Sequence, residues 1–237
     1  MLLALCIIFM SLGMVSLTLF LLEKTRKYSV KAVMLKSITS LFFILTAAVG
    51  LYKDGQNKLA LCVMLGLLFG LLGDIWLDMK YVYRDSDKPY TYAGFVMFCL
   101  GHVCYIVGIF LEYFNNAHPL YIVLPLVGGS LLALLPILLE KPMKLHYGKM
   151  KWIVFLYGVV LFSMSLCALS MNILYGWKSV TLIMLFVGGI LFAISDLILS
   201  GTYFGVGKER NVDIISNAVI YYLAQFIIAF ALFFIII

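Results

Sequence analysis

Charged residues are scarce in this sequence. Asp, Glu, Lys and Arg make up 12% of its 237 residues, whereas apolar residues make up 65%. Soluble domains are typically about one quarter charged and about half apolar. A chain with so few charges cannot surround a folded core with a water-facing surface, and it is too apolar to stay disordered. The composition excludes a soluble globular enzyme, a disordered chain and a nucleic-acid-binding module, and it indicates a polytopic membrane protein.

Cysteine is also sparse, and its spacing does not suggest a metal site. The sequence contains no CxxC pair. The five cysteines all fall inside apolar stretches: Cys6, Cys62, Cys99, Cys104 and Cys167. An odd number of cysteines in apolar helices is typical of small hydrophobic side chains rather than of disulfides. Zinc sites favour several His and Cys ligands, so we expect neither a metal nor another cofactor.

Long apolar runs, by contrast, are abundant. A helix needs about 20 apolar residues to cross the hydrocarbon core. Eight stretches meet this length, at about 2–22, 31–51, 59–78, 91–113, 119–139, 151–172, 178–200 and 213–237. We therefore expect an all-α fold with eight transmembrane helices in a single domain, residues 1–237. The first run lacks a preceding basic residue and a small-x-small cleavage site, which favours a retained span over a signal peptide.

Proline and the basic residues add detail to these spans. Pro119, Pro125 and Pro136 fall in the fifth span and predict that it is kinked or partly unwound. Of the 17 Lys and Arg residues, 13 lie in the odd-numbered loops, three lie in the even-numbered loops, and Lys36 lies inside the second span. Because positive loops stay in the cytoplasm, we expect both termini on the opposite side. Short loops suggest a bacterial inner membrane.

Polar side chains at membrane depth are costly and indicate a functional site. They are Lys36 in the second span, Asp74 and Asp78 in the third, His102 in the fourth, Ser195 and Asp196 in the seventh, and Asn217, Tyr221 and Gln225 in the eighth. The last three are spaced i, i+4 and i+8, so they share one helix face. We expect these residues to line one cavity that opens toward the cytoplasm. The structural alternative is that Asp74 and Asp196 pair with Lys36 and merely hold three helices together.

The two halves of the chain are alike around the aspartates. Gly73-Asp74-x-x-Leu77 matches Ser195-Asp196-x-x-Leu199 in pattern, and a polar residue follows each aspartate 28 or 29 residues later, at His102 and at Gln225. Four spans in each half preserve orientation, so the pattern predicts a parallel four-plus-four repeat with the site at its pseudo-axis. Chance similarity between apolar helices is the alternative.

Four motifs in order resemble the YhhN-like family, which includes lysoplasmalogenases. They are Gly-Asp-x-x-Leu at 73–77, Phe-x-x-Gly-His-x-x-Tyr at 98–105, Phe-x-x-Ser-Asp-x-x-Leu at 192–199 and Tyr-x-x-Ala-Gln at 221–225. The resemblance runs from about residue 30 to about residue 230, and a Lys near the start of the second span is also typical of the family. Ser37 stands where the family pattern has a proline, a difference that bears on local helix geometry.

This resemblance implies that the protein hydrolyses the vinyl ether bond of a lysoplasmalogen. The products are a fatty aldehyde and a glycerophospho-base, such as glycerophosphoethanolamine or glycerophosphocholine. The substrate is then a lysophospholipid taken from the bilayer, with no nucleic-acid partner, and the sequence leaves the oligomeric state open.

Vinyl ether cleavage begins with protonation of the outer alkene carbon, which produces an oxocarbenium ion that water attacks. Two carboxyl groups in different charge states suit such chemistry. We therefore predict Asp74 and Asp196 as acid and base, without knowing which is which. Lys36 would hold one carboxylate ionised or bind the phosphate. The supporting residues predicted at the site are Asp78, His102, Tyr105, Ser195, Asn217, Tyr221, Tyr222 and Gln225.

Two other classes fit the same residues. Parallel repeats and polar groups near the midplane are typical of transporters for small solutes or lipids, which would show flux without bond cleavage. A metal-dependent lipid hydrolase would lose activity to chelators and recover it with zinc. A pure scaffold would leave Asp74, His102 and Asp196 without a task.

Overall fold

The eight predicted spans are present in the computed structural model, which describes residues 1–26, 29–54, 57–83, 85, 87–114, 117–205 and 210–235. Over these residues the fold consists of helices, without a β-strand. In chain order they are α1 (Leu2–Lys24), α2 (Val30–Asp54), α3 (Lys58–Val82), α4 (Asp87–Tyr113), α5 (Leu120–Leu132), α6 (Leu134–Leu138), η2 (Gly148–Met150), α7 (Lys151–Leu174), α8 (Val180–Phe204), α9 (Asn211–Ala231) and η3 (Leu232–Phe234). The all-α prediction is confirmed.

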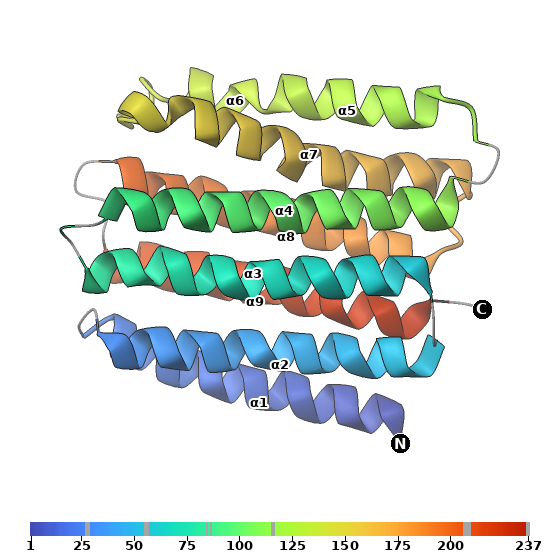
Figure 1. The fold of residues 1–237 in the computed structure, drawn as a ribbon, viewed down its shortest axis with the longest axis horizontal. Helices are drawn as coiled ribbons and strands as arrows, with labels where there is room; N and C mark the ends of the chain where they lie inside the picture. The colour runs from blue at the N-terminus through green and yellow to red at the C-terminus, as the bar shows by residue number, and fades with distance from the viewer. Residues whose placement is uncertain are drawn as a thin grey trace.

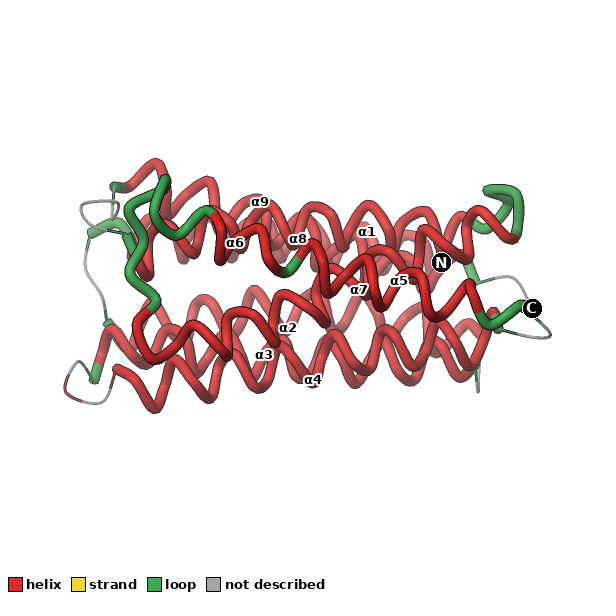
Figure 2. The backbone as a smooth tube through the Cα atoms, turned by 90° about the horizontal axis from the view of Figure 1, so that it is seen from above, coloured by secondary structure: helices red, strands yellow, loops and turns green. Residues whose placement is uncertain are grey.

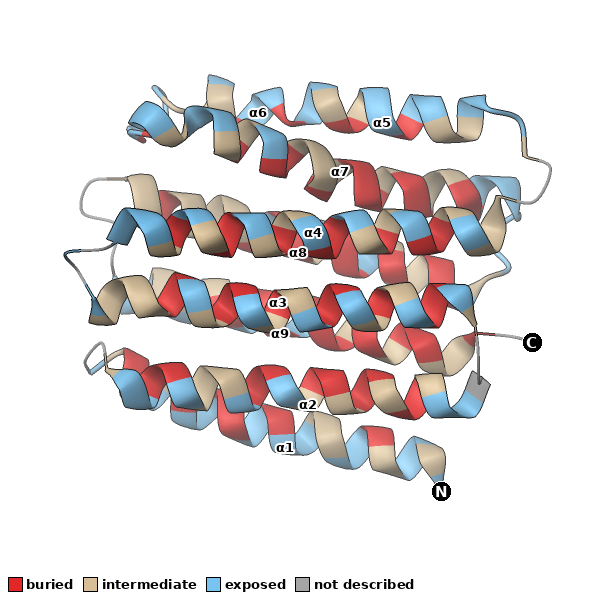
Figure 3. Ribbon diagram, in the orientation of Figure 1, coloured by how far each residue is buried: buried red, intermediate tan, exposed pale blue. Residues whose placement is uncertain are grey.

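The spans run side by side in one antiparallel bundle, with both chain termini at the same end (Figure 1). Seen from above, α2, α3 and α4 follow one side of the bundle and α1, α8 and α9 follow the other (Figure 2). Exposed residues occur along every span (Figure 3). Many of them are large and apolar, among them Val15, Leu124, Leu131 and Leu138. An apolar surface of this extent fits contact with lipid. The placement of the termini outside the cytoplasm stays a prediction.

Glycines let α3 and α4 approach closely, as small residues do in membrane bundles. A Cβ atom on Gly66 would lie 2.8 Å from the carbonyl oxygen of Gly101, and one on Gly101 would lie 2.9 Å from the carbonyl oxygen of Gly66. Both distances are well below van der Waals contact. The two backbones therefore fit together only because both positions lack a side chain.

The fifth span is interrupted, as its prolines predicted. The helix ends at Leu132 and resumes at Leu134, four and two residues before Pro136, which has no N–H to donate to the Leu132 carbonyl. Pro125 lies inside α5 without breaking it. The carbonyl that Pro125 leaves without its helical donor is that of Tyr121, and it accepts a hydrogen bond from Ser170 Oγ on α7 at 2.9 Å.

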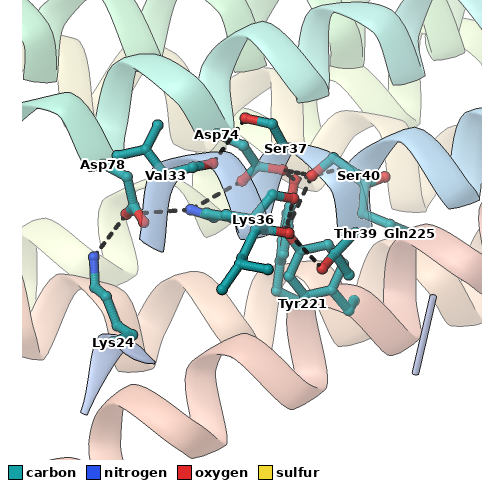
Figure 4. A network of polar contacts seen from close by, with 12 residues as sticks. Lys24, Val33, Lys36, Ser37, Thr39, Ser40, Asp74, Asp78, Tyr221 and Gln225 are labelled. Carbon is teal, nitrogen blue, oxygen red and sulfur yellow. Dashed lines mark hydrogen bonds and ion pairs between the residues drawn. The ribbon is translucent and has the colours of Figure 1, made fainter. Parts of the chain in front are cut away.

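Helix α2 continues without a break through Ser37, the position at which the resemblance led us to expect a proline. Its Oγ donates to the Val33 carbonyl oxygen at 2.9 Å, one turn earlier (Figure 4). A proline at this position could make no such bond. The departure thus affects the local hydrogen bonding of α2, and Lys36 stays on a regular helix.

The main helix contacts fall into matching sets. The first half contains α1, α2, α3 and α4, and the second contains α5, α7, α8 and α9. Within the halves, the α1–α2 contact corresponds to α5–α7, α2–α3 to α7–α8, and α3–α4 to α8–α9. Between the halves, α4–α7 corresponds to α9–α2. A parallel four-plus-four repeat requires these correspondences. The repeat itself stays a prediction, because similar contacts also arise in bundles without internal symmetry.

Candidate active site

A cavity lies in the half of the bundle that contains the lysine-rich loops. It has room of about 110 Å³ for water-sized molecules and is lined by side chains from α1, α2, α3, α4, α6, α7, α8 and α9. Its polar wall contains seven of the predicted site residues: Lys36, Asp74, Asp78, Asp196, Asn217, Tyr221 and Tyr222. The remaining wall is mostly apolar and includes Phe95, Pro136, Val154, Leu161 and Phe162. The cavity is thus amphiphilic, with its charges gathered on a few helices.

Asp74 is held by donors from two other helices (Figure 4). Lys36 Nζ on α2 lies 3.1 Å from Asp74 Oδ1. Ser40, one turn further along α2, donates to Oδ2 at 2.6 Å, and Tyr221 on α9 donates to the same oxygen at 2.8 Å. The Asp74 side chain is only 2% exposed. Because all three neighbours donate and one is a cation, the geometry suits a carboxylate at Asp74.

Asp78 lies one turn closer to the end of the bundle, between two lysines. Its Oδ1 is 3.0 Å from Lys24 Nζ on α1 and 3.5 Å from Lys36 Nζ on α2. The ammonium group of Lys24 also lies 4.2 Å from the centre of the Tyr81 ring, a cation–π contact. The first span therefore contributes a charged residue to the cavity wall.

The polar stripe predicted on α9 contacts the neighbouring helices along its length. Asn217 donates to the Ser195 carbonyl oxygen of α8 at 2.7 Å, and Tyr221 donates to Asp74. Gln225 Nε2 donates to the Tyr221 hydroxyl at 2.9 Å and so helps to fix the position of that hydroxyl. Tyr222 OH contacts the Lys36 carbonyl oxygen at 3.0 Å. Together these contacts join α9 to α2, α3 and α8 around the cavity.

Asp196 has a different kind of partner. The hydroxyl of Tyr157 on α7 makes a short hydrogen bond to Asp196 Oδ2. Within the described residues, no Lys, Arg or His side chain forms an ion pair with Asp196. The structural alternative, in which Lys36 pairs with both aspartates, therefore holds for Asp74 and not for Asp196.

Four predicted site residues are not in the cavity wall. His102 is 1% exposed; its ring packs 4.7 Å from that of Phe192, and neither ring nitrogen has a hydrogen-bond partner among the described residues. Tyr105 is buried where α4 packs against Gly66 of α3. Ser195 donates to the Phe192 carbonyl oxygen at 3.0 Å, and Gln225 reaches the cavity only through Tyr221. A direct role for these four residues in binding stays a prediction.

Three residues that contact the aspartates of the site escaped the sequence analysis, and two of them carried a signal. Ser40 follows Lys36 by one helical turn, so it shares a face with it. Tyr157 precedes Asp196 by 39 residues, much as Lys36 precedes Asp74 by 38. Lys24 has no comparable signal, because a lysine at the end of an apolar span is usually a topology residue.

The loop between α6 and α7 lies at the end of the bundle nearest the cavity (Figure 2). Glu140 Oε2 accepts from Lys151 Nζ at 2.6 Å, and Oε1 accepts from the Tyr147 backbone N–H at 3.2 Å. The hydrogen bond from Lys151 lowers the pKa of Glu140. The Tyr147 hydroxyl lies 2.9 Å from the Oγ of Ser200, which lines the cavity, and burial raises the pKa of Tyr147. The loop is thereby attached directly to the cavity wall.

Metal ligands do not gather at this site or elsewhere within the described residues. No group of three His, Cys, Asp or Glu side chains there lies close enough together to hold a metal ion. All five cysteines are free thiols, as their spacing predicted.

Comparisons with known proteins bear on the chain as a whole. Neither the comparison with curated proteins nor that with solved structures found a match. The protein-family model described as the YhhN family matches residues 31–232, which covers every span except the first. A match over this share of the sequence agrees with the four motifs and with the bundle that brings them together, so the chain belongs to the YhhN family.

Proposed function

We propose that the protein is a lysoplasmalogenase, an ether hydrolase that cleaves the vinyl ether bond of lysoplasmalogens. Membership of the YhhN family supports a hydrolase. The observation that carries the proposal is that Asp74 and Asp196 line one cavity with unlike partners, a lysine for Asp74 and a tyrosine for Asp196. Acid–base hydrolysis needs two such groups, one protonated and one ionised.

The reaction begins when the protonated carboxyl group donates its proton to the outer alkene carbon. The carbon bonded to oxygen becomes an oxocarbenium ion, which a nearby carboxylate stabilises. Water adds to this carbon as the second carboxylate removes one of its protons, and a hemiacetal forms. The hemiacetal hydroxyl then returns a proton to the first carboxylate while the second protonates the ether oxygen. Aldehyde and alcohol leave, and both carboxyl groups regain their starting states.

The cavity suits an amphiphilic substrate. In the proposed complex the glycerophospho part faces the charged end, where Lys24 and Lys36 lie, and the alkenyl chain follows the apolar wall toward Phe95 and Phe162. A lysophospholipid would then enter from the bilayer, with bound water near the carboxyl groups. We also propose a bacterial inner membrane with both termini outside the cytoplasm, which reporter fusions to the two ends would test.

The test uses purified protein in detergent with a lysoplasmalogen and, separately, its saturated alkyl ether analogue. We expect fatty aldehyde from the vinyl ether alone. Asp74→Asn and Asp196→Asn should each lower kcat by about 10²- to 10⁴-fold, the usual contribution of a general acid or base. Asp87→Asn is a matched control, because Asp87 is an exposed residue at the start of α4, outside the cavity.

Full activity in both cavity variants would refute the two-carboxyl mechanism. If folded wild-type protein released no aldehyde, the proposed lysoplasmalogenase activity would be refuted. Solute or lipid flux in vesicles would then favour a transporter, and activity that depends on added zinc would favour a metal-dependent lipid hydrolase.

A further inference from the structure

The two carboxyl groups of the cavity occupy corresponding places but differ in charge environment. Asp74 lies near the end of α3 and takes its partner, Lys36, from α2. Asp196 lies near the end of α8 and takes its partner, Tyr157, from α7. The two partners precede their aspartates by 38 and 39 residues. A cation in the first half is thus matched by a neutral phenol in the second.

Among the described residues that line the cavity, the other charges cancel. Besides Asp196, its Asp and Lys residues are Lys24, Lys36, Asp74 and Asp78. The two lysines and two aspartates form a continuous chain of ion pairs. An ionised Asp196 would add an uncompensated negative charge to a largely apolar cavity, and an unpaired buried charge is strongly unfavourable.

We propose that Tyr157 is a positioning residue that aims a neutral Asp196 into the cavity, and that Asp196 stays neutral because it is buried without an ion-pair partner among the described residues, whereas Lys36 holds Asp74 as the carboxylate. One phenolic donor supplies a hydrogen bond without supplying a charge. Asp74 accepts from three donors, one of them a cation, and these donors stabilise its ionised form. Asp196 is then the acid that protonates the alkene carbon, and Asp74 is the base that activates water.

The assignment of acid and base rests on the proposed function, but the charge assignment does not need a substrate and is tested without one. Infrared spectra of the purified protein, in a detergent without ester or carboxyl groups, report the carbonyl stretch of protonated carboxyl groups. We expect wild type to show a band that Asp196→Asn removes. Lys36→Met/Asp74→Asn removes a cation and an anion together, and it should keep the band.

Variants of Tyr157 separate its role from simple packing. Tyr157→Phe keeps the ring but removes the hydrogen bond, so the band should persist at a higher frequency. Tyr157→Lys puts a cation beside Asp196, as in the first half of the chain, and should abolish the band. Tyr175→Phe is a matched control, since Tyr175 OH donates to the Tyr113 carbonyl oxygen at the other end of the bundle.

The proposed role of Tyr157 also predicts a change in kcat. Misplacing a reacting group by about 1 Å costs on the order of 10²-fold in rate, so Tyr157→Phe should lower kcat by about that factor with little change in KM. A band that survives in Asp196→Asn and disappears in Lys36→Met/Asp74→Asn would overturn the assignment. If the band follows the prediction but wild type releases no aldehyde, the proposed function fails and the charge assignment stands.

Discussion

The ion pair between Lys36 and Asp74 allows a quantitative prediction. Lys36→Met replaces the ammonium group with an apolar chain of similar length, and Asp74 is left 2% exposed without its cation. Removing one partner of a buried ion pair costs about 3–5 kcal/mol. Asp78 is affected less, because Lys24 remains 3.0 Å away. We therefore expect Lys36→Met to destabilise the protein by about 3–5 kcal/mol.

Asp74→Asn should be milder. The amide oxygen still accepts from Ser40 or Tyr221, and Lys36 still forms its ion pair with Asp78, whose Oδ1 lies 3.5 Å from Lys36 Nζ. Loss of hydrogen bonds of this kind costs about 1–3 kcal/mol. The double variant leaves neither charge unpaired at this site. It should therefore be more stable than the sum of the single losses predicts, by a coupling energy of about 1–3 kcal/mol.

The assay is reversible unfolding of the four proteins in mixed detergent micelles, followed by circular dichroism. Lys58→Met is the matched control. Lys58 is exposed at the start of α3, so the change should be within about 0.5 kcal/mol. Additive losses in the double variant, or a larger loss for Asp74→Asn than for Lys36→Met, would refute the reasoning.

Three further predictions concern other parts of the bundle. Gly66→Ala should lower the free energy of unfolding by about 1–3 kcal/mol, because the added methyl group overpacks the α3–α4 contact; an unchanged unfolding midpoint would contradict this. Lys24→Met should destabilise less than Lys36→Met in the same assay, because Asp78 keeps its second lysine. The folded state lowers the pKa of Glu140, so its stabilising effect is present at neutral pH and is lost as pH falls through that lowered value. The protection factors of the backbone amides of residues 139–147 should therefore fall below the usual titration range of glutamate, and Glu140→Gln should show low protection factors already at neutral pH.

Much of the fold could be predicted because membrane spans obey a simple length and hydropathy rule. The interruption before Pro136 also followed from the missing N–H of proline. The gathering of Lys36, Asp74, Asp196 and Tyr221 in one half of the bundle followed from their positions along alternating spans. These features depend on distance along a helix, which a sequence records directly.

The partners within the site depend on how the helices are rotated and packed, which one sequence does not record. His102 faces an aromatic cluster and not the cavity, although its ring and that of Tyr221 both contact Phe192. Tyr157 is one of several aromatic residues in its span; its spacing from Asp196 resembles that of Lys36 from Asp74, but its hydrogen bond to Asp196 is visible only in the fold. Lys24 resembles an ordinary topology residue in the sequence, and only the fold shows that its long side chain reaches from α1 to Asp78 on α3.

The most direct test of the central claim is to follow the hydrolysis of a lysoplasmalogen in heavy water that is also enriched in oxygen-18. Protonation of the outer alkene carbon predicts one deuterium on the aldehyde carbon next to the carbonyl group. Addition of water to the other alkene carbon predicts that the glycerol oxygen of the glycerophospho product stays unlabelled. Aldehyde without that deuterium, labelled glycerol oxygen, or no aldehyde from folded protein would contradict the proposed reaction.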